Sequence, residues 1–85
     1  MTSNDYVQYV LTVYSDERPS FIRLGQWAFN KLAETHPEIA EEIRGNDELD
    51  PFHKTENLRN LFNYLIVKIT MNNRIIPTKA IVDHS

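Results

Sequence analysis

The sequence predicts a small, mainly α-helical protein: a single-domain bundle of about four helices, followed by an irregular or short β C-terminal tail. Apolar residues recur at helical spacing, and the 85-residue length suits one domain. With 41% hydrophobic and 25% charged residues, the composition is that of an ordinary globular chain. Cysteine is absent, which excludes disulfides, thiolate zinc sites and a cysteine nucleophile.

Residues 6–14 fit the first helix, because Val7, Val10, Leu11 and Tyr14 follow the i, i+3, i+4, i+7 spacing of one helical face. We expect Ser3 or Asn4 to cap this helix. The valines and tyrosines of the same segment favour a strand by propensity, so a strand stays the alternative.

A second helix is expected to start at residue 19 or 20 and to end at residue 34 or 35. Its apolar face would hold Phe21, Leu24, Ala28 and Leu32, with Trp27 on one flank. Gly25 lies inside this segment, where glycine disfavours a helix. We interpret Gly25 as a point where another helix approaches closely.

Thr35 and Glu38 have the spacing of a capping box, so Thr35 is predicted to cap a short third helix that contains Ile39 and Ile43. Gly45 suits a left-handed residue that ends it. The loop over residues 46–53 would be fixed to the core by Leu49 and Phe52, and Asp50 would accept backbone hydrogen bonds there.

The fourth helix, over residues 55–68, has the strongest amphipathic pattern in the chain. Its apolar positions are Leu58, Leu61, Phe62, Leu65 and Ile69. Beyond it, Met71-Asn72-Asn73 fits the turn of a small hairpin. A helix that ends there, before a loose tail, is the other interpretation, and Pro77 is expected to end either structure. We therefore divide the chain into a helical domain, 1–69, and a C-terminal tail or arm, 70–85.

Charge is distributed unevenly along the chain, which carries −3 overall. Residues 34–50 contain seven acidic residues and only Arg44 as a base, whereas residues 51–82 contain five basic residues and only Glu56 as an acid. No apolar run approaches the roughly 20 residues that span a bilayer, and the first residues have no signal-peptide pattern. A cytoplasmic protein is expected.

Four short motifs resemble a group of short, mostly uncharacterised proteins encoded by tailed bacteriophages. The resemblance covers about residues 20–65, and it departs at Glu48 and in an extension from about Thr70. It implies a phage protein that acts in the cytoplasm of the host cell, and it implies no mechanism. The motifs are Arg23-Leu24-Gly25-Gln26-Trp27-x-Phe29-Asn30-x-Leu32, Pro37-x-Ile39-Ala40, Ile43-Arg44-Gly45 and Leu49-Asp50-Pro51-Phe52.

No pattern in the sequence indicates a catalytic centre, a cofactor or a metal site. Asp47, Glu48, Asp50 and His53 are crowded together, but their spacing matches no calcium-binding loop. The chain also lacks a phosphate-binding glycine-rich loop, because it contains only two glycines. We therefore expect a protein without enzymatic activity.

The leading hypothesis is a protein that binds and modulates, by inhibition, a host or defence protein. The predicted partner-binding residues are Trp27, Glu38, Glu41 and Glu42, because aromatic side chains anchor interfaces and an acidic face suits a basic partner. The alternative is a small RNA- or DNA-binding protein, and self-association is left open. That alternative would use Lys54, Arg59, Lys68, Arg74 and Lys79.

Overall fold

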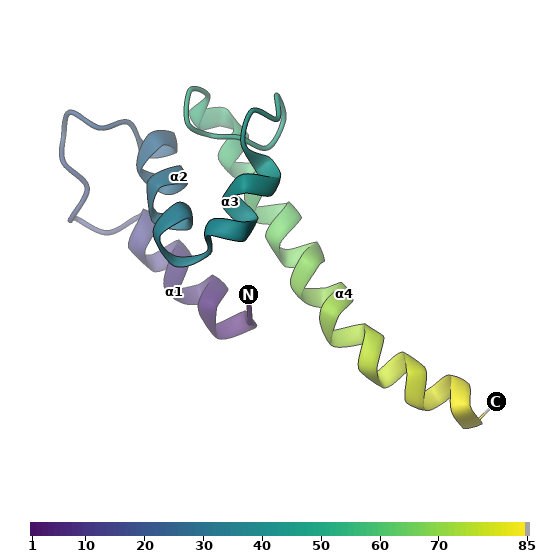
Figure 1. Ribbon diagram of the computed structural model, residues 1–85. Coiled ribbons are helices and arrows are strands. Elements are labelled where there is room, and N and C mark those ends of the chain that lie inside the picture. Colours follow the sequence, from purple (N-terminus) through teal and green to yellow (C-terminus); the bar gives the residue numbers. More distant parts are fainter. Residues whose placement is uncertain (85) are drawn as a thin grey trace.

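The computed structural model describes the backbone of residues 1–84 and the side chains of residues 1–71. Its elements, in chain order, are α1 (Ser3–Val13), α2 (Leu24–Thr35), α3 (Pro37–Ile43), a 3-10 turn η1 (Thr55–Asn57) and α4 (Leu58–His84), as Figure 1 shows. No strand occurs in residues 1–84. The predicted mainly helical fold class is confirmed.

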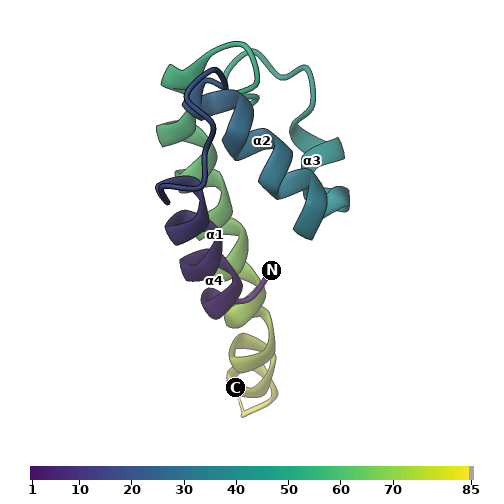
Figure 2. The same ribbon diagram turned by 90° about the vertical axis from the view of Figure 1, so that its left-hand side faces the viewer.

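The helices enclose one apolar core, to which all four contribute. Its most deeply buried side chains are Val13 from α1, Leu32 from α2, Ile43 from α3 and Leu61 and Leu65 from α4, each with no exposed area. The helix α1 lies beside the first half of α4, and α2 and α3 pack against this pair (Figure 2). The last turns of α4 run past the other helices (Figure 1), so the molecule is 56 Å long and 25 Å wide.

The N-terminal segment is a helix rather than a strand, because a helix buries Tyr9 and Val13 on the same side. The hydroxyl of Tyr9 donates a hydrogen bond to the carbonyl oxygen of Ala28 at 2.7 Å, which fixes α1 to α2. The cap is Thr2, one residue before the predicted Ser3. Its side chain accepts from the backbone N–H of Asp5, and the Asp5 carboxylate accepts from the backbone N–H of Thr2, completing a capping box.

The second helix begins at Leu24, so the predicted start at residue 19 or 20 is wrong. Two arginines explain the late start. The Arg18 guanidinium donates to the carbonyl oxygen of Ile22 at 2.6 Å, and this bond stabilises the turns that residues 18–22 form before the helix. Arg23 has an extended backbone and donates to the carbonyl oxygen of Phe52 at 2.7 Å. Phe21 therefore lies outside the helix instead of on its apolar face.

The junction between α2 and α3 differs from the predicted one. Thr35 does not cap α3, because it is the last residue of α2 and its hydroxyl donates to the carbonyl oxygen of Lys31. His36 alone links the helices: its N–H donates to the carbonyl oxygen of Leu32, and its own carbonyl accepts from Ile39 and Ala40. The Pro37 that follows fits the first turn of α3, since a proline there loses no helical bond.

The two glycines satisfy two different requirements. Gly45 follows α3 with φ +76°, the left-handed conformation that its sequence position predicts. Gly25 is a point of close approach, as predicted, but its neighbour is the chain leading into α4 rather than another helix. A Cβ at this position would meet the carbonyl oxygen of Pro51 and would lie 2.9 Å from the Cα of Thr55.

Asn57 fixes the loop between α3 and α4. Leu49 and Phe52 pack against the core from this loop, as predicted. The Asn57 side chain, 6% exposed, donates from its amide nitrogen to the carbonyl oxygens of Asp47 at 2.8 Å and Asp50 at 2.9 Å. One buried amide group therefore joins both halves of the loop to the start of α4.

Replacing Asn57 by alanine is expected to lower the free energy of unfolding by about 1–3 kcal/mol, because the two carbonyl groups lose their donor. Urea denaturation followed by circular dichroism measures this change. Asn60→Ala is the matched control, since the exposed Asn60 amide donates to the carbonyl of Glu48 alone. A loss no larger for Asn57→Ala than for Asn60→Ala would show that Asn57 does not fix the loop.

The fourth helix starts one turn later and ends much later than predicted. Thr55–Asn57 forms a 3-10 turn, and α4 then runs without interruption from Leu58 to His84. The predicted hairpin and the predicted helix end near residue 68 are both wrong, and Pro77 does not end the helix. Ile69 is the last buried side chain among those described. The division of the chain at residues 69 and 70 stays a prediction.

Candidate protein-binding surface

Trp27, one of the predicted partner-binding residues, is 8% exposed and belongs to the contact between α1 and α2. Its indole N–H donates to the carbonyl oxygen of Thr12 at 3.2 Å. The ammonium group of Lys31 lies 4.4 Å from the centre of the ring and covers it from outside. The ring is therefore engaged within the chain and has little surface left for a partner.

The predicted acidic residues lie together on α3, but they differ in how far their carboxylates are free to contact a partner. Glu38 and Glu41 are exposed, and Glu41 accepts a hydrogen bond from the Arg44 guanidinium at 2.8 Å. Glu42 faces α4, where it accepts from the Tyr64 hydroxyl at 2.7 Å and from the Lys68 ammonium at 3.0 Å. Glu42 therefore joins α3 to α4, while Glu38 and Glu41 stay open to solvent.

The hydrogen bond from Tyr64, followed by the one from Lys68, holds the pKa of Glu42 below its ordinary value of 4.5. A lowered carboxyl pKa means that folding favours the ionised group. The stability that Glu42 contributes is thus complete above the pKa of the unfolded chain, and it is lost as the pH falls through the lower pKa of the folded chain. Because half-exposed pairs are screened by water, this contribution is small.

Replacing Tyr64 by phenylalanine is expected to raise the pKa of Glu42 toward 4.5, because the strongest bond to its ionised form is removed. A carbon-detected NMR titration of the glutamate carboxyl groups measures this pKa directly. Tyr14→Phe is the control, since the exposed Tyr14 packs beside Phe62 and has no bond to Glu42. An unchanged Glu42 pKa in Tyr64→Phe would contradict the hydrogen bond.

The basic residues of the nucleic-acid alternative do not form one patch within the described side chains. Lys68 is bound to Glu42, whereas Lys54 and Arg59 are exposed. Arg59 and Lys68 are nine positions apart on α4, about two and a half turns, so they project from opposite sides of the helix. The side chains of Arg74 and Lys79 lie outside the described residues.

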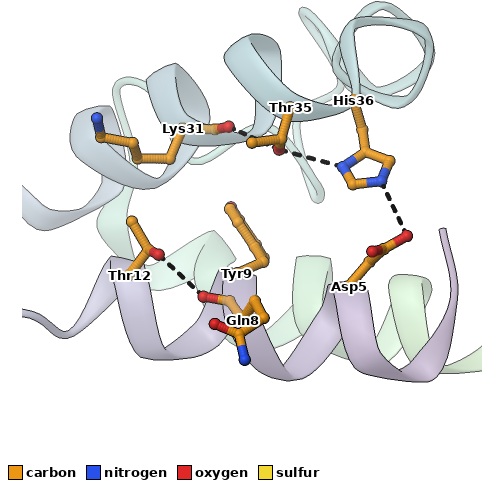
Figure 3. A pocket seen from close by; sticks show the side chains of 7 residues that line it. All are labelled: Asp5, Gln8, Tyr9, Thr12, Lys31, Thr35 and His36. Carbon is orange, nitrogen blue, oxygen red and sulfur yellow. Dashed lines mark hydrogen bonds and ion pairs between the residues drawn. The ribbon is translucent and has the colours of Figure 1, made fainter.

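A hollow of about 410 Å³ lies between α1 and α2. Its polar lining comes from one face of α1 and from the end of α2, with Tyr9 between them (Figure 3). The Thr12 hydroxyl donates to the carbonyl oxygen of Gln8, and the Tyr9 hydroxyl to that of Ala28. These groups therefore already have partners within the chain.

Asp5, His36 and Thr35 follow one another in this hollow in the order of a carboxylate, an imidazole and a hydroxyl (Figure 3). His36 Nε2 lies 3.5 Å from the Asp5 carboxylate, and its Nδ1 lies 3.1 Å from the Thr35 hydroxyl oxygen. Because that hydroxyl donates to the carbonyl oxygen of Lys31, its oxygen can only accept from His36. A base activates a hydroxyl by accepting its proton, so this contact does not activate Thr35 as a nucleophile. The contact instead ties the start of α1 to the α2–α3 junction.

The acidic loop before η1 is organised by backbone contacts. The Asp50 carboxylate accepts from the N–H of Gly45 at 2.7 Å and of Phe52 at 2.9 Å, which confirms the predicted backbone hydrogen bonds of this aspartate. Among the described side chains, no three histidine, aspartate or glutamate residues lie close enough to hold a metal ion together.

Exposed apolar side chains are the feature that the sequence did not indicate. Phe21 is 86% exposed, and on α1 Leu11 is 61% and Tyr14 59% exposed. The face predicted to be apolar, with Val7, Val10, Leu11 and Tyr14, is therefore not the one that α1 buries, because the helix turns Tyr9 and Val13 toward α2 and α4 instead. Among the side chains of residues 1–71, the large apolar ones that are exposed are Val7, Leu11, Tyr14, Phe21, Ile66, Val67 and Met71.

The loop that carries Phe21 is held at both ends. At its start, the Ser15 hydroxyl donates to the carbonyl oxygen of Thr12 at 2.8 Å. At its end, Arg18 binds Ile22 and Arg23 binds Phe52, as described above. The phenyl ring therefore projects into solvent from a constrained loop.

Comparisons with protein-family models, with curated proteins and with solved structures found no match to this chain. The resemblance to the phage group stays a prediction. Within the part of the chain described above, no helix combines the length and apolar character that crossing a bilayer requires.

Proposed function

We propose that this chain is a non-enzymatic protein that binds another protein and modulates it, with Phe21 as the apolar anchor. The observation that carries the proposal is the 86% exposure of a phenylalanine on a constrained loop. A large aromatic ring left in water has an unfavourable hydration free energy, which burial against a partner removes. Aromatic side chains of this kind contribute strongly to protein interfaces.

The constrained loop supports this proposal for a second reason. Binding costs less conformational entropy when the contacting segment is already ordered. The hydrogen bonds made by Ser15, Arg18 and Arg23 order the loop in the free protein. Phe21 is thus held ready for insertion into a pocket, as anchor residues are in tight complexes.

The target class follows from the phage resemblance. A phage protein of this kind would act on a host or bacterial defence protein, and it would inhibit that protein by steric occlusion. Glu38 supplies exposed negative charge, and Glu41 adds to it although Arg44 pairs with it at the surface; this charge favours a partner with a basic surface and speeds its association. Trp27 and Glu42 take no direct part in this version of the proposal, because both are bound within the chain.

The test compares proteins captured from bacterial lysate by the wild type, by Phe21→Ala and by Val67→Ala. Phe21→Ala is expected to lose a captured protein that the other two retain, and its unfolding curve should match that of the wild type. Val67 is the matched control, since it is an apolar residue 55% exposed on α4. If all three capture the same proteins in the same amounts, Phe21 is not an anchor.

The same experiment distinguishes protein binding from the alternative, binding to RNA or DNA. Captured material that disappears after nuclease treatment, with affinity that falls steeply as salt rises, would indicate binding to phosphate groups. Charge reversal at Glu38 and Glu41 would strengthen that binding and weaken binding to a basic protein. The protein-binding proposal requires capture that is resistant to nuclease.

A further inference from the structure

The hollow between α1 and α2 carries opposite charges at its two ends. At one end lies the ammonium group of Lys31, over the Trp27 ring whose indole N–H binds the carbonyl oxygen of Thr12. At the other end lies the Asp5 carboxylate, beside His36 (Figure 3). Asp5 and Thr12 are seven residues apart on α1, so the two ends are separated by about 10 Å at 1.5 Å per residue.

The Asp5 end of the hollow brings two hydrogen-bond acceptors together. Nδ1 of His36 donates to the Thr35 hydroxyl oxygen at 3.1 Å, so Nε2 of the neutral ring is an acceptor. This acceptor faces an Asp5 carboxylate oxygen, itself an acceptor, at 3.5 Å. Within the described residues, no donor binds the other oxygen of that carboxylate. A ligand with an ammonium group would supply N–H donors to both side chains.

The Lys31 end of the hollow suits an anion. The ammonium group has three N–H donors, and its one ion pair among the described side chains is with Glu34 at 3.1 Å. The Glu34 side chain is 62% exposed, so water screens this pair and a ligand carboxylate can replace it at little cost. The hollow therefore offers a site for a positive group at one end and for a negative group at the other.

Gln8 lies on α1 between the two ends and lines the hollow (Figure 3). Its side-chain amide is exposed and forms no hydrogen bond within the described part of the chain. An amide both donates and accepts, which matches the N–H and C=O of a peptide group. The volume of about 410 Å³ is in the range of small-ligand sites. Three residues of extended peptide span about 10 Å, which equals the separation of the ends.

We propose that this hollow binds a short peptide of about three residues with free termini. Its amino group lies between Asp5 and His36, its carboxylate binds Lys31, and Gln8 binds its central peptide group. The opposite charges at the ends fix the direction of the bound peptide. This inference goes beyond the proposed function, because it uses a different surface from the loop that carries Phe21.

The test measures binding of trialanine to the full chain by calorimetry and NMR titration, beside N-acetyl-trialanine, trialanine amide and single alanine. Trialanine should shift the backbone amide signals of Gln8, Thr35 and His36. Each blocked peptide should bind several-fold more weakly, since each lacks one of the paired charges, and alanine should also bind more weakly, since it cannot reach both ends. Equal affinity for the blocked and free peptides, or no binding of trialanine at millimolar concentration, overturns the proposal.

Two variants assign the ends of the peptide. Asp5→Asn should weaken binding of trialanine several-fold and leave N-acetyl-trialanine unchanged, and it can still accept from the N–H of Thr2 in the cap. Asp16→Asn, at an exposed position in the loop after α1, is the matched control and should bind like the wild type. Lys31→Met should abolish the difference between trialanine and its amide.

Glu34→Gln gives a change in the opposite direction. It should tighten the binding of trialanine, because Lys31 loses its competing ion pair, and it should leave the binding of the amide unchanged. Circular dichroism should show that all of these variants are folded. Variants at Asp5 and Lys31 that weaken all the peptides equally would show that these side chains support the fold and do not bind the termini, which also overturns the proposal.

Discussion

Replacing Leu65 by alanine is expected to lower the free energy of unfolding by about 2–5 kcal/mol. Leu65 has no exposed area and belongs to the apolar core to which all four helices contribute. The change removes apolar contacts and leaves a cavity that the surrounding helices can fill only in part. For a chain of this length, such a loss is a large fraction of the total stability.

Chemical denaturation of Leu65→Ala beside Val67→Ala measures this effect. Val67 is on the same helix and 55% exposed, so its truncation should change stability by less than about 0.5 kcal/mol. If Leu65→Ala and Val67→Ala lower the free energy of unfolding by similar amounts, the side of α4 that carries Leu65 is not packed against the other helices.

Replacing Gly25 by alanine is expected to lower the free energy of unfolding by roughly 1–3 kcal/mol, the usual cost of overpacking. In an isolated helix the same change would be stabilising by up to about 1 kcal/mol, because alanine favours a helix. The sign is reversed here because the new methyl group would meet the carbonyl oxygen of Pro51 and the backbone of Thr55. Both obstacles are backbone atoms, which cannot rotate away as a side chain would.

Thermal unfolding of Gly25→Ala tests this reversal of sign. Glu34→Ala serves as the control, because Glu34 is exposed on the same helix and its ion pair with Lys31 lies at the surface. The control should stay within about 0.5 kcal/mol of the wild type. A Gly25→Ala variant that is more stable than the wild type would show that α2 and the loop before α4 can separate at this point.

The candidate surface could be predicted only in part. The acidic character of α3 followed from its composition, and Glu38 and Glu41 are exposed there. The involvement of Trp27 and Glu42 in contacts within the chain could not be predicted, because those contacts join residues far apart in sequence. Trp27 binds Thr12, and Glu42 binds Tyr64 and Lys68. Phe21 was expected on an apolar face and is exposed instead, since Arg18 and Arg23 delay the start of α2.

The sequence by itself determined the features that depend on neighbouring residues. Amphipathic spacing determined that the chain is helical and which face of α4 is buried, and backbone preference determined the left-handed Gly45. Only the tertiary structure decided where α2 begins, what lies against Gly25 and how far α4 extends. These features depend on contacts between distant segments, such as Arg23 with Phe52 and Gly25 with Thr55, and periodicity along the chain carries no information about them.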